Sequence, residues 1–171
     1  FVDYVGKSVR RGQPLLTIYS PDLVATQREY LLALRAQKQL GELRSNDEKA
    51  RALLLVGDAQ LGVRDLPAAL AALQEAQRLV EKAMKEGGSV PALPLSLSDV
   101  QAKTGLLHFY LRDYDKSISC YNEALRILEQ VPDLDPKELA VRKVRLFNNI
   151  AGVYIRRSDY ATALPYFQQA V

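Results

Sequence analysis

The chain has 171 residues, of which 48% are hydrophobic and 25% are charged, the proportions of one globular domain with room for an appendage. A net charge of +3 is too small to imply nucleic-acid binding by itself, and no apolar run is long enough for a membrane span. With one cysteine and one histidine, the chain has no intramolecular disulfide, no cysteine-rich zinc site and no assignable Ser-His-Asp set. Neither catalytic residues nor a cofactor is predicted.

The first 20 residues differ from the rest of the chain. They are rich in β-branched and aromatic residues, and Gly6 and Gly12 mark turns between them. This pattern predicts two short strands, near residues 2–5 and 14–19.

A helix is predicted to follow, from Pro21 to about Leu40. Ser20 can cap its first turn, Pro21 suits the first helical position, and Gly41 ends it.

Residues 1–42 resemble the periplasmic adaptor (membrane fusion) subunits of heavy-metal efflux pumps. The similar segments are VGKSVRRGQPL at 5–15, IYSPDLV at 18–24 and QREYL at 27–31. The resemblance implies a partial lipoyl-like β segment with a helix of adaptor type. A half-domain leaves unpaired strand edges, so residues 1–19 are expected to be partly ordered or to mediate self-association. Metal sites of that family use methionines, and because Met84 alone cannot form one, no metal site is predicted.

Three copies of one helical pattern fill the rest of the chain. A small residue stands at the predicted helix crossing of each copy, at Ala69, Ser117 and Ala163, which are 48 and 46 residues apart. A large residue follows four positions later and an alanine seven positions later in every copy. Because a single pair of helices cannot bury both its faces, the copies predict a stack of helical hairpins.

These copies resemble the tetratricopeptide repeat, whose pattern includes Leu-Gly, Asp-Tyr, a small Ala and a large aromatic residue. The matching motifs are Val56-Gly57 and Asp65-Leu66, then Gly105 and Asp113-Tyr114, then Phe147, Tyr154 and Asp159-Tyr160. The resemblance implies a mostly α fold of antiparallel helix hairpins, a tetratricopeptide-like α-solenoid, behind the short N-terminal β segment. Since the spacing exceeds the roughly 34 residues of the family, we expect its long-helix variant. The hairpins are expected at about residues 47–85, 97–130 and 136–171, within a domain that spans 43–171.

Residues 86–96 are predicted to link the first two hairpins, since two glycines end one helix and two prolines block the next. The second hairpin is expected to begin with Ser96 or Ser98 as its cap. Asp135 followed by Pro136 is expected to begin the third.

In tetratricopeptide arrays the first helices of the repeats line a concave groove. The resemblance therefore implies a non-enzymatic scaffold that binds a protein or peptide there. By register with the third repeat, Arg51, Ala102 and Leu106 are among the groove-facing residues. The predicted binding residues are Lys103, Tyr110, Arg145, Asn148, Asn149 and Arg156. Cations beside amide donors suit an acidic or extended peptide. The carboxylate-clamp subtype has Lys and Asn where this chain has Leu54 and Asp58, so its ligand is not predicted.

Two questions stay open at this point. Asn148 and Asn149 are poor helix formers, so either one of them bonds locally between helices or both donate to an extended peptide backbone. The chain is either the groove-binding scaffold or a structural fragment of an efflux-pump adaptor. The second alternative implies the bacterial periplasm or cell envelope, and the first the cytoplasm. Because the sequence begins at Phe1 and its helical pattern continues to Val171, we expect a longer parent chain.

Overall fold

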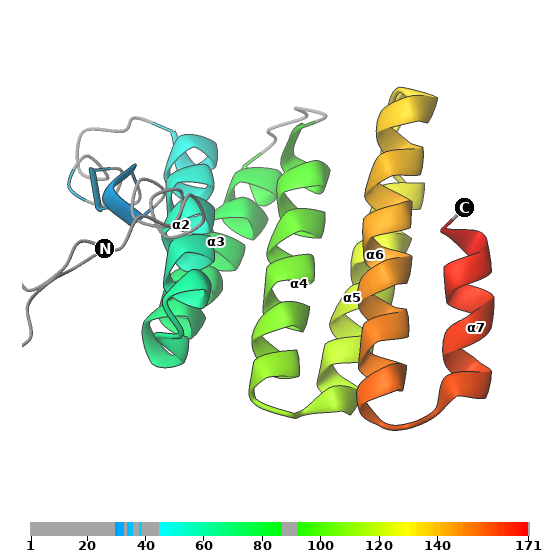
Figure 1. Ribbon diagram of the computed structural model, residues 1–171. Helices are drawn as coiled ribbons and strands as arrows, with labels where there is room; N and C mark the ends of the chain where they lie inside the picture. Colours follow the sequence, from blue (N-terminus) through cyan, green and yellow to red (C-terminus); the bar gives the residue numbers. More distant parts are fainter. Residues whose placement is uncertain (1–29, 33, 36–37, 39–44, 87–91, 171) are drawn as a thin grey trace, which may run out of the picture.

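The computed structural model describes residues 30–32, 34–35, 38, 45–86 and 92–170 (Figure 1). Within them the helices with complete bounds are α2 (Asn46–Gly62), α3 (Leu66–Lys85), α4 (Ala92–Tyr110), α5 (Tyr114–Glu129), α6 (Pro136–Arg156) and α7 (Tyr160–Gln169). The described residues between 30 and 38 are also helical, inside the helix predicted for residues 21–40. The strands predicted near residues 2–5 and 14–19 lie outside the described residues.

The helices form three hairpins in a row, α2–α3, α4–α5 and α6–α7 (Figure 1). Helix α4 contacts both α2 and α6, so the first helices of the hairpins lie side by side. Helices α3 and α5 form a second layer, in which α3 also packs on α4 and α5 on α6. The helical repeat architecture predicted from the sequence is thus confirmed.

A hydrophobic cluster joins each hairpin to the next. Leu61 and Leu73 of the first hairpin pack with Leu107 of α4, and all three are buried. The corresponding cluster between α5 and α6 contains Tyr121, Ala124, Leu128, Leu146, Ile150 and Val153. Since burial of apolar surface is the main favourable term in folding, the first helix of each following hairpin stabilises the hairpin before it.

The turn within each hairpin has the same conformation in all three repeats. Arg64, Arg112 and Ser158 have φ angles of 64°, 61° and 61°, in the left-handed region. The next residue is an aspartate each time, and its carboxylate accepts a hydrogen bond from the backbone N–H three residues later. Because a left-handed non-glycine residue costs roughly 1–2 kcal/mol, the N-cap and the packing of the hairpin must hold this turn.

The two helices of the second hairpin approach closely at Gly105. A Cβ atom added to Gly105 would lie 2.8 Å from the ring of Tyr121, which is buried. The hydroxyl of the buried Ser117 donates to the carbonyl oxygen of Gly105 at 2.8 Å, which satisfies a polar group that water cannot reach. In the first hairpin, a Cβ atom added to Gly57 would lie 3.1 Å from the side chain of Leu73.

Helix α4 begins at Ala92, earlier than the start expected at residue 97. Pro94 lies in its first turn, where the missing N–H breaks no helical hydrogen bond. The expected caps, Ser96 and Ser98, are therefore inside the helix and buried. The hydroxyl of Ser98 donates to the carbonyl oxygen of Ala124 at 3.0 Å and links α4 to α5.

The substitutions Gly105→Ala and Gly152→Ala should change stability in opposite directions. A methyl group at Gly105 collides with Tyr121 and should lower the free energy of unfolding by about 1–3 kcal/mol. An added Cβ at Gly152, inside α6, meets no atom within 4 Å, so alanine there should raise it by about 0.5–1 kcal/mol. Urea unfolding at low protein concentration, followed by circular dichroism, measures both. Equal effects would contradict the packing described at Gly105.

Candidate functional site

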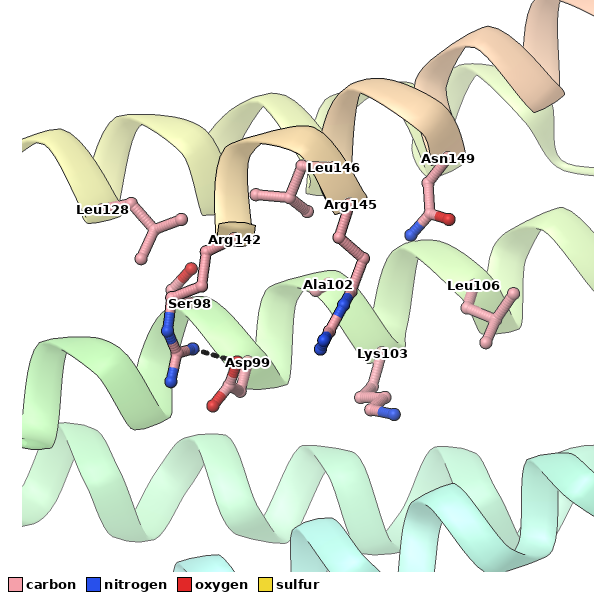
Figure 2. A pocket seen from close by; sticks show the side chains of 10 residues that line it. All are labelled: Ser98, Asp99, Ala102, Lys103, Leu106, Leu128, Arg142, Arg145, Leu146 and Asn149. Carbon is pink, nitrogen blue, oxygen red and sulfur yellow. Dashed lines mark hydrogen bonds and ion pairs between the residues drawn. The ribbon is translucent and has the colours of Figure 1, made fainter. Parts of the chain in front are cut away.

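Two adjoining hollows follow the first helices of the three hairpins, and together we call them the groove. The smaller, of about 230 Å³, lies between α4 and α6, and the larger, of about 500 Å³, extends to α2. Both are lined by Asp99, Lys103, Arg142 and Arg145. Figure 2 shows these side chains projecting from α4 and α6 into the smaller hollow.

Ion pairs across the groove join each first helix to the next. Lys103 of α4 pairs with Asp58 of α2. Arg142 of α6 pairs with Asp99 of α4 at 2.8 Å (Figure 2). It also pairs with Glu138 of its own helix at 3.0 Å. In both pairs the earlier repeat supplies the carboxylate and the later one the cation, so the charges of Lys103 and Arg142 are compensated within the protein.

Arg145 differs from these two cations. It is exposed, lines both hollows of the groove, and also lines a third hollow beside Lys137. Its side chain lies between those of Arg142 and Lys103 (Figure 2). No ion pair or hydrogen bond to Arg145 is found within the described part of the chain. The larger hollow is also lined by Arg51, which pairs with Asp47 at 3.1 Å, so among its four cationic side chains Arg145 alone has no carboxylate partner in the described residues.

Neutral groups complete the groove. The side chain of Asn149, one helical turn after Arg145, points into the smaller hollow (Figure 2). Leu106 lines the same hollow, and Leu54 and Leu55 line the larger one. Leu55 is 59% exposed, so part of the apolar lining is open to solvent. The groove thus offers a cation, an amide and apolar surface to a ligand.

The structure places the six predicted binding residues on different surfaces. Tyr110 lies beside Arg64, whose Cζ is 4.0 Å from its ring centroid, and Arg156 lies over Phe109 at 5.9 Å. Asn148 is exposed on α6 and lines neither hollow. The residues brought together in the groove are Lys103, Arg145 and Asn149.

The sequence interpretation missed Asp99 and Arg142 as groove residues. Asp99 precedes Lys103 by four positions and Arg142 precedes Arg145 by three, and residues so spaced share one face of a helix. Helical spacing alone could therefore have found both.

Residues 100–130 match the family model described as Tetratricopeptide repeat. The match supports a tetratricopeptide-like helical protein. It runs from the middle of α4 to the residue after α5, and thus covers the close approach at Gly105. Repeats of this family are typically non-enzymatic interaction modules. No curated protein matches the chain, and the resemblance of residues 1–42 to efflux-pump adaptors is not supported.

Within the described residues no helix is long and apolar enough to cross a membrane, and no group of three or more His, Cys, Asp or Glu side chains is placed to hold a metal ion. Cys120 lies on α5, outside the groove lining. Burial raises the pKa of its thiol, which lowers the fraction of reactive thiolate.

The ion pair between Asp99 and Arg142 should contribute modestly to stability. A double-mutant cycle with Asp99→Ala and Arg142→Ala should give a coupling energy of about 0.2–1 kcal/mol, because both groups are partly exposed. The coupling should fall when salt is added. Pairing Asp99→Ala with Arg126→Ala, on α5, serves as the control, and a coupling of the same size there would show that the cycle does not report this contact.

Proposed function

We propose that this chain is a protein-interaction scaffold whose groove binds an acidic protein segment in an extended conformation. The observation that carries the proposal is Arg145, an uncompensated cation where the hollows meet. A carboxylate that approaches it forms charge-assisted hydrogen bonds without first breaking an ion pair of the protein. Lys103 and Arg142 contribute less, since a ligand must compete there with Asp58 and Asp99.

An extended segment fits the neutral part of the groove. The amide of Asn149 can donate to a carbonyl oxygen and accept from an N–H, the two groups that an extended backbone leaves unpaired. Since Asn149 lies one turn from Arg145, one acidic side chain and a nearby peptide group can be bound together.

Apolar side chains near the acidic residue of the ligand would also be bound. Leu106 lines the smaller hollow and Leu54 and Leu55 the larger, and Arg145 lines both. Full burial of one ligand side chain of the Val, Leu or Phe type is worth about 1.5–3 kcal/mol, similar to a hydrogen bond to a charged group. We therefore expect the ligand to combine one acidic residue with apolar neighbours.

Selection of random displayed peptides on the immobilised protein tests this proposal. Enriched sequences should contain Asp or Glu beside Leu, Ile, Val or Phe. Arg145→Gln should weaken binding of a selected peptide roughly tenfold, which corresponds to about 1.4 kcal/mol. Added salt should weaken binding to the unaltered protein more than to this variant.

Arg126→Gln is the matched control, because Arg126 is an exposed cation on α5 outside both hollows. It should leave the affinity unchanged. Two results would count against the proposal: enriched peptides without acidic residues, or the same loss of affinity in both variants.

A further inference from the structure

A row of three charged side chains crosses the groove, one from each first helix. Arg51 of α2, Asp99 of α4 and Arg145 of α6 stand 48 and 46 residues apart, the same spacing as the small residues at the helix crossings. Because α4 lies beside both α2 and α6, equivalent positions of the three helices are neighbours. All three side chains line the larger hollow, so a ligand that lies across the helices meets a cation, a carboxylate and a second cation in that order.

Ion pairs within the protein do not hide the charges of this row. In the pair between Arg142 and Asp99, the aspartate side chain is 45% exposed and the arginine side chain 25%. In the pair between Arg51 and Asp47 the arginine side chain is 54% exposed and the aspartate side chain 25%. The member of the row is thus the more exposed partner in each pair, and Arg145 has no partner within the described residues.

The middle of the row is negative. Arg142 is shared between Asp99 and Glu138, so these three side chains together carry a net charge of one negative unit. Lys103 is neutralised by Asp58, which lines the same hollow and is the more exposed member of that pair as well. A ligand therefore meets excess negative charge at α4, between the two arginines of the row.

Asp99 has room for a cation of the ligand. Its Oδ1 atom accepts the hydrogen bond from Arg142 at 2.8 Å (Figure 2). Its Oδ2 atom has no hydrogen bond or ion pair within the described residues. Since each oxygen of a carboxylate can accept hydrogen bonds, a lysine or arginine of a ligand can bind Asp99 without breaking the pair with Arg142.

The distance between the helices determines how far apart the charges of a matching ligand must be. Helices that pack side by side lie roughly 8–10 Å apart, axis to axis. A segment in the polyproline II conformation rises about 3.1 Å per residue with three residues per turn, so its residues i and i+3 point the same way and lie about 9 Å apart. Side chains on one face of a β-strand repeat about every 6.6–6.8 Å instead, which does not match the helix spacing.

We propose that the ligand of the groove is a segment of mixed charge in the polyproline II conformation. Its acidic residue binds Arg145, and a lysine or arginine three residues away binds Asp99. A second acidic residue, three residues beyond the basic one, faces Arg51. The proposal rests on the function proposed above, since it concerns the ligand of the same groove. The charges also fix the register of the ligand, because a shift by one helix brings like charges together.

Peptides selected on the immobilised protein test the proposal. Enriched sequences should contain Lys or Arg three residues from Asp or Glu. In one selected synthetic peptide, replacement of the basic residue by Gln should weaken binding to the unaltered protein roughly fivefold, as for a half-exposed ion pair. The same replacement should leave the affinity for the Asp99→Asn variant unchanged, because the partner of the basic residue is gone.

Glu123→Gln is the matched control, because Glu123 is a carboxylate on α5 that pairs with Arg126 outside both hollows. In this variant the peptide replacement should cost as much affinity as in the unaltered protein. A second measurement needs no protein variant: moving the basic residue of the peptide by one position should weaken binding as much as removing it.

The outcomes separate this proposal from the proposed function. Enriched peptides that contain an acidic residue but no basic residue at that distance would overturn the mixed-charge ligand and leave the acidic ligand of the groove in place. Equal losses of affinity with the unaltered protein and with Asp99→Asn would also overturn the mixed-charge ligand. Enriched peptides without any acidic residue would overturn both.

Discussion

The spacing of the helices depends on one steric constraint, a small residue that faces a large one inside a hairpin. Gly57 faces Leu73 and Gly105 faces Tyr121, and a Cβ at either glycine would press on the opposite side chain. Close approach also brings the hydroxyl of Ser117 to the carbonyl oxygen of Gly105. Because the first two hairpins are held together in this way, each behaves as a unit whose outer face can stack on the next hairpin.

Stacking in turn determines the electrostatics of the groove. It aligns α2, α4 and α6 so that Asp58 and Asp99 reach cations of the following repeat. The repeats have Arg51, Asp99 and Arg145 at one equivalent position, and within the described residues Arg145 is the member of this set without an ion pair. Arg145 is therefore the uncompensated cation of the groove, which we take as the basis of the proposed ligand binding.

Adjacent residues of α6 lie on different sides of that helix, because successive residues of a helix point about 100° apart. Asn149 accordingly lines the groove, whereas its neighbour Asn148 is exposed and lines neither hollow.

The sequence by itself determined the three hairpins, because the alternation of small and large residues and the aspartate caps are local patterns. Of the six binding residues that it predicted through the register of the repeats, Lys103, Arg145 and Asn149 line the hollows, and their role in binding stays a prediction. It did not determine the start of α4, since Pro94 is compatible with a first turn as well as with a linker. Only the tertiary structure decided which cations are compensated. The pairs Asp58–Lys103 and Asp99–Arg142 join residues 45 and 43 positions apart, and only the stacking of complete hairpins brings such residues into contact.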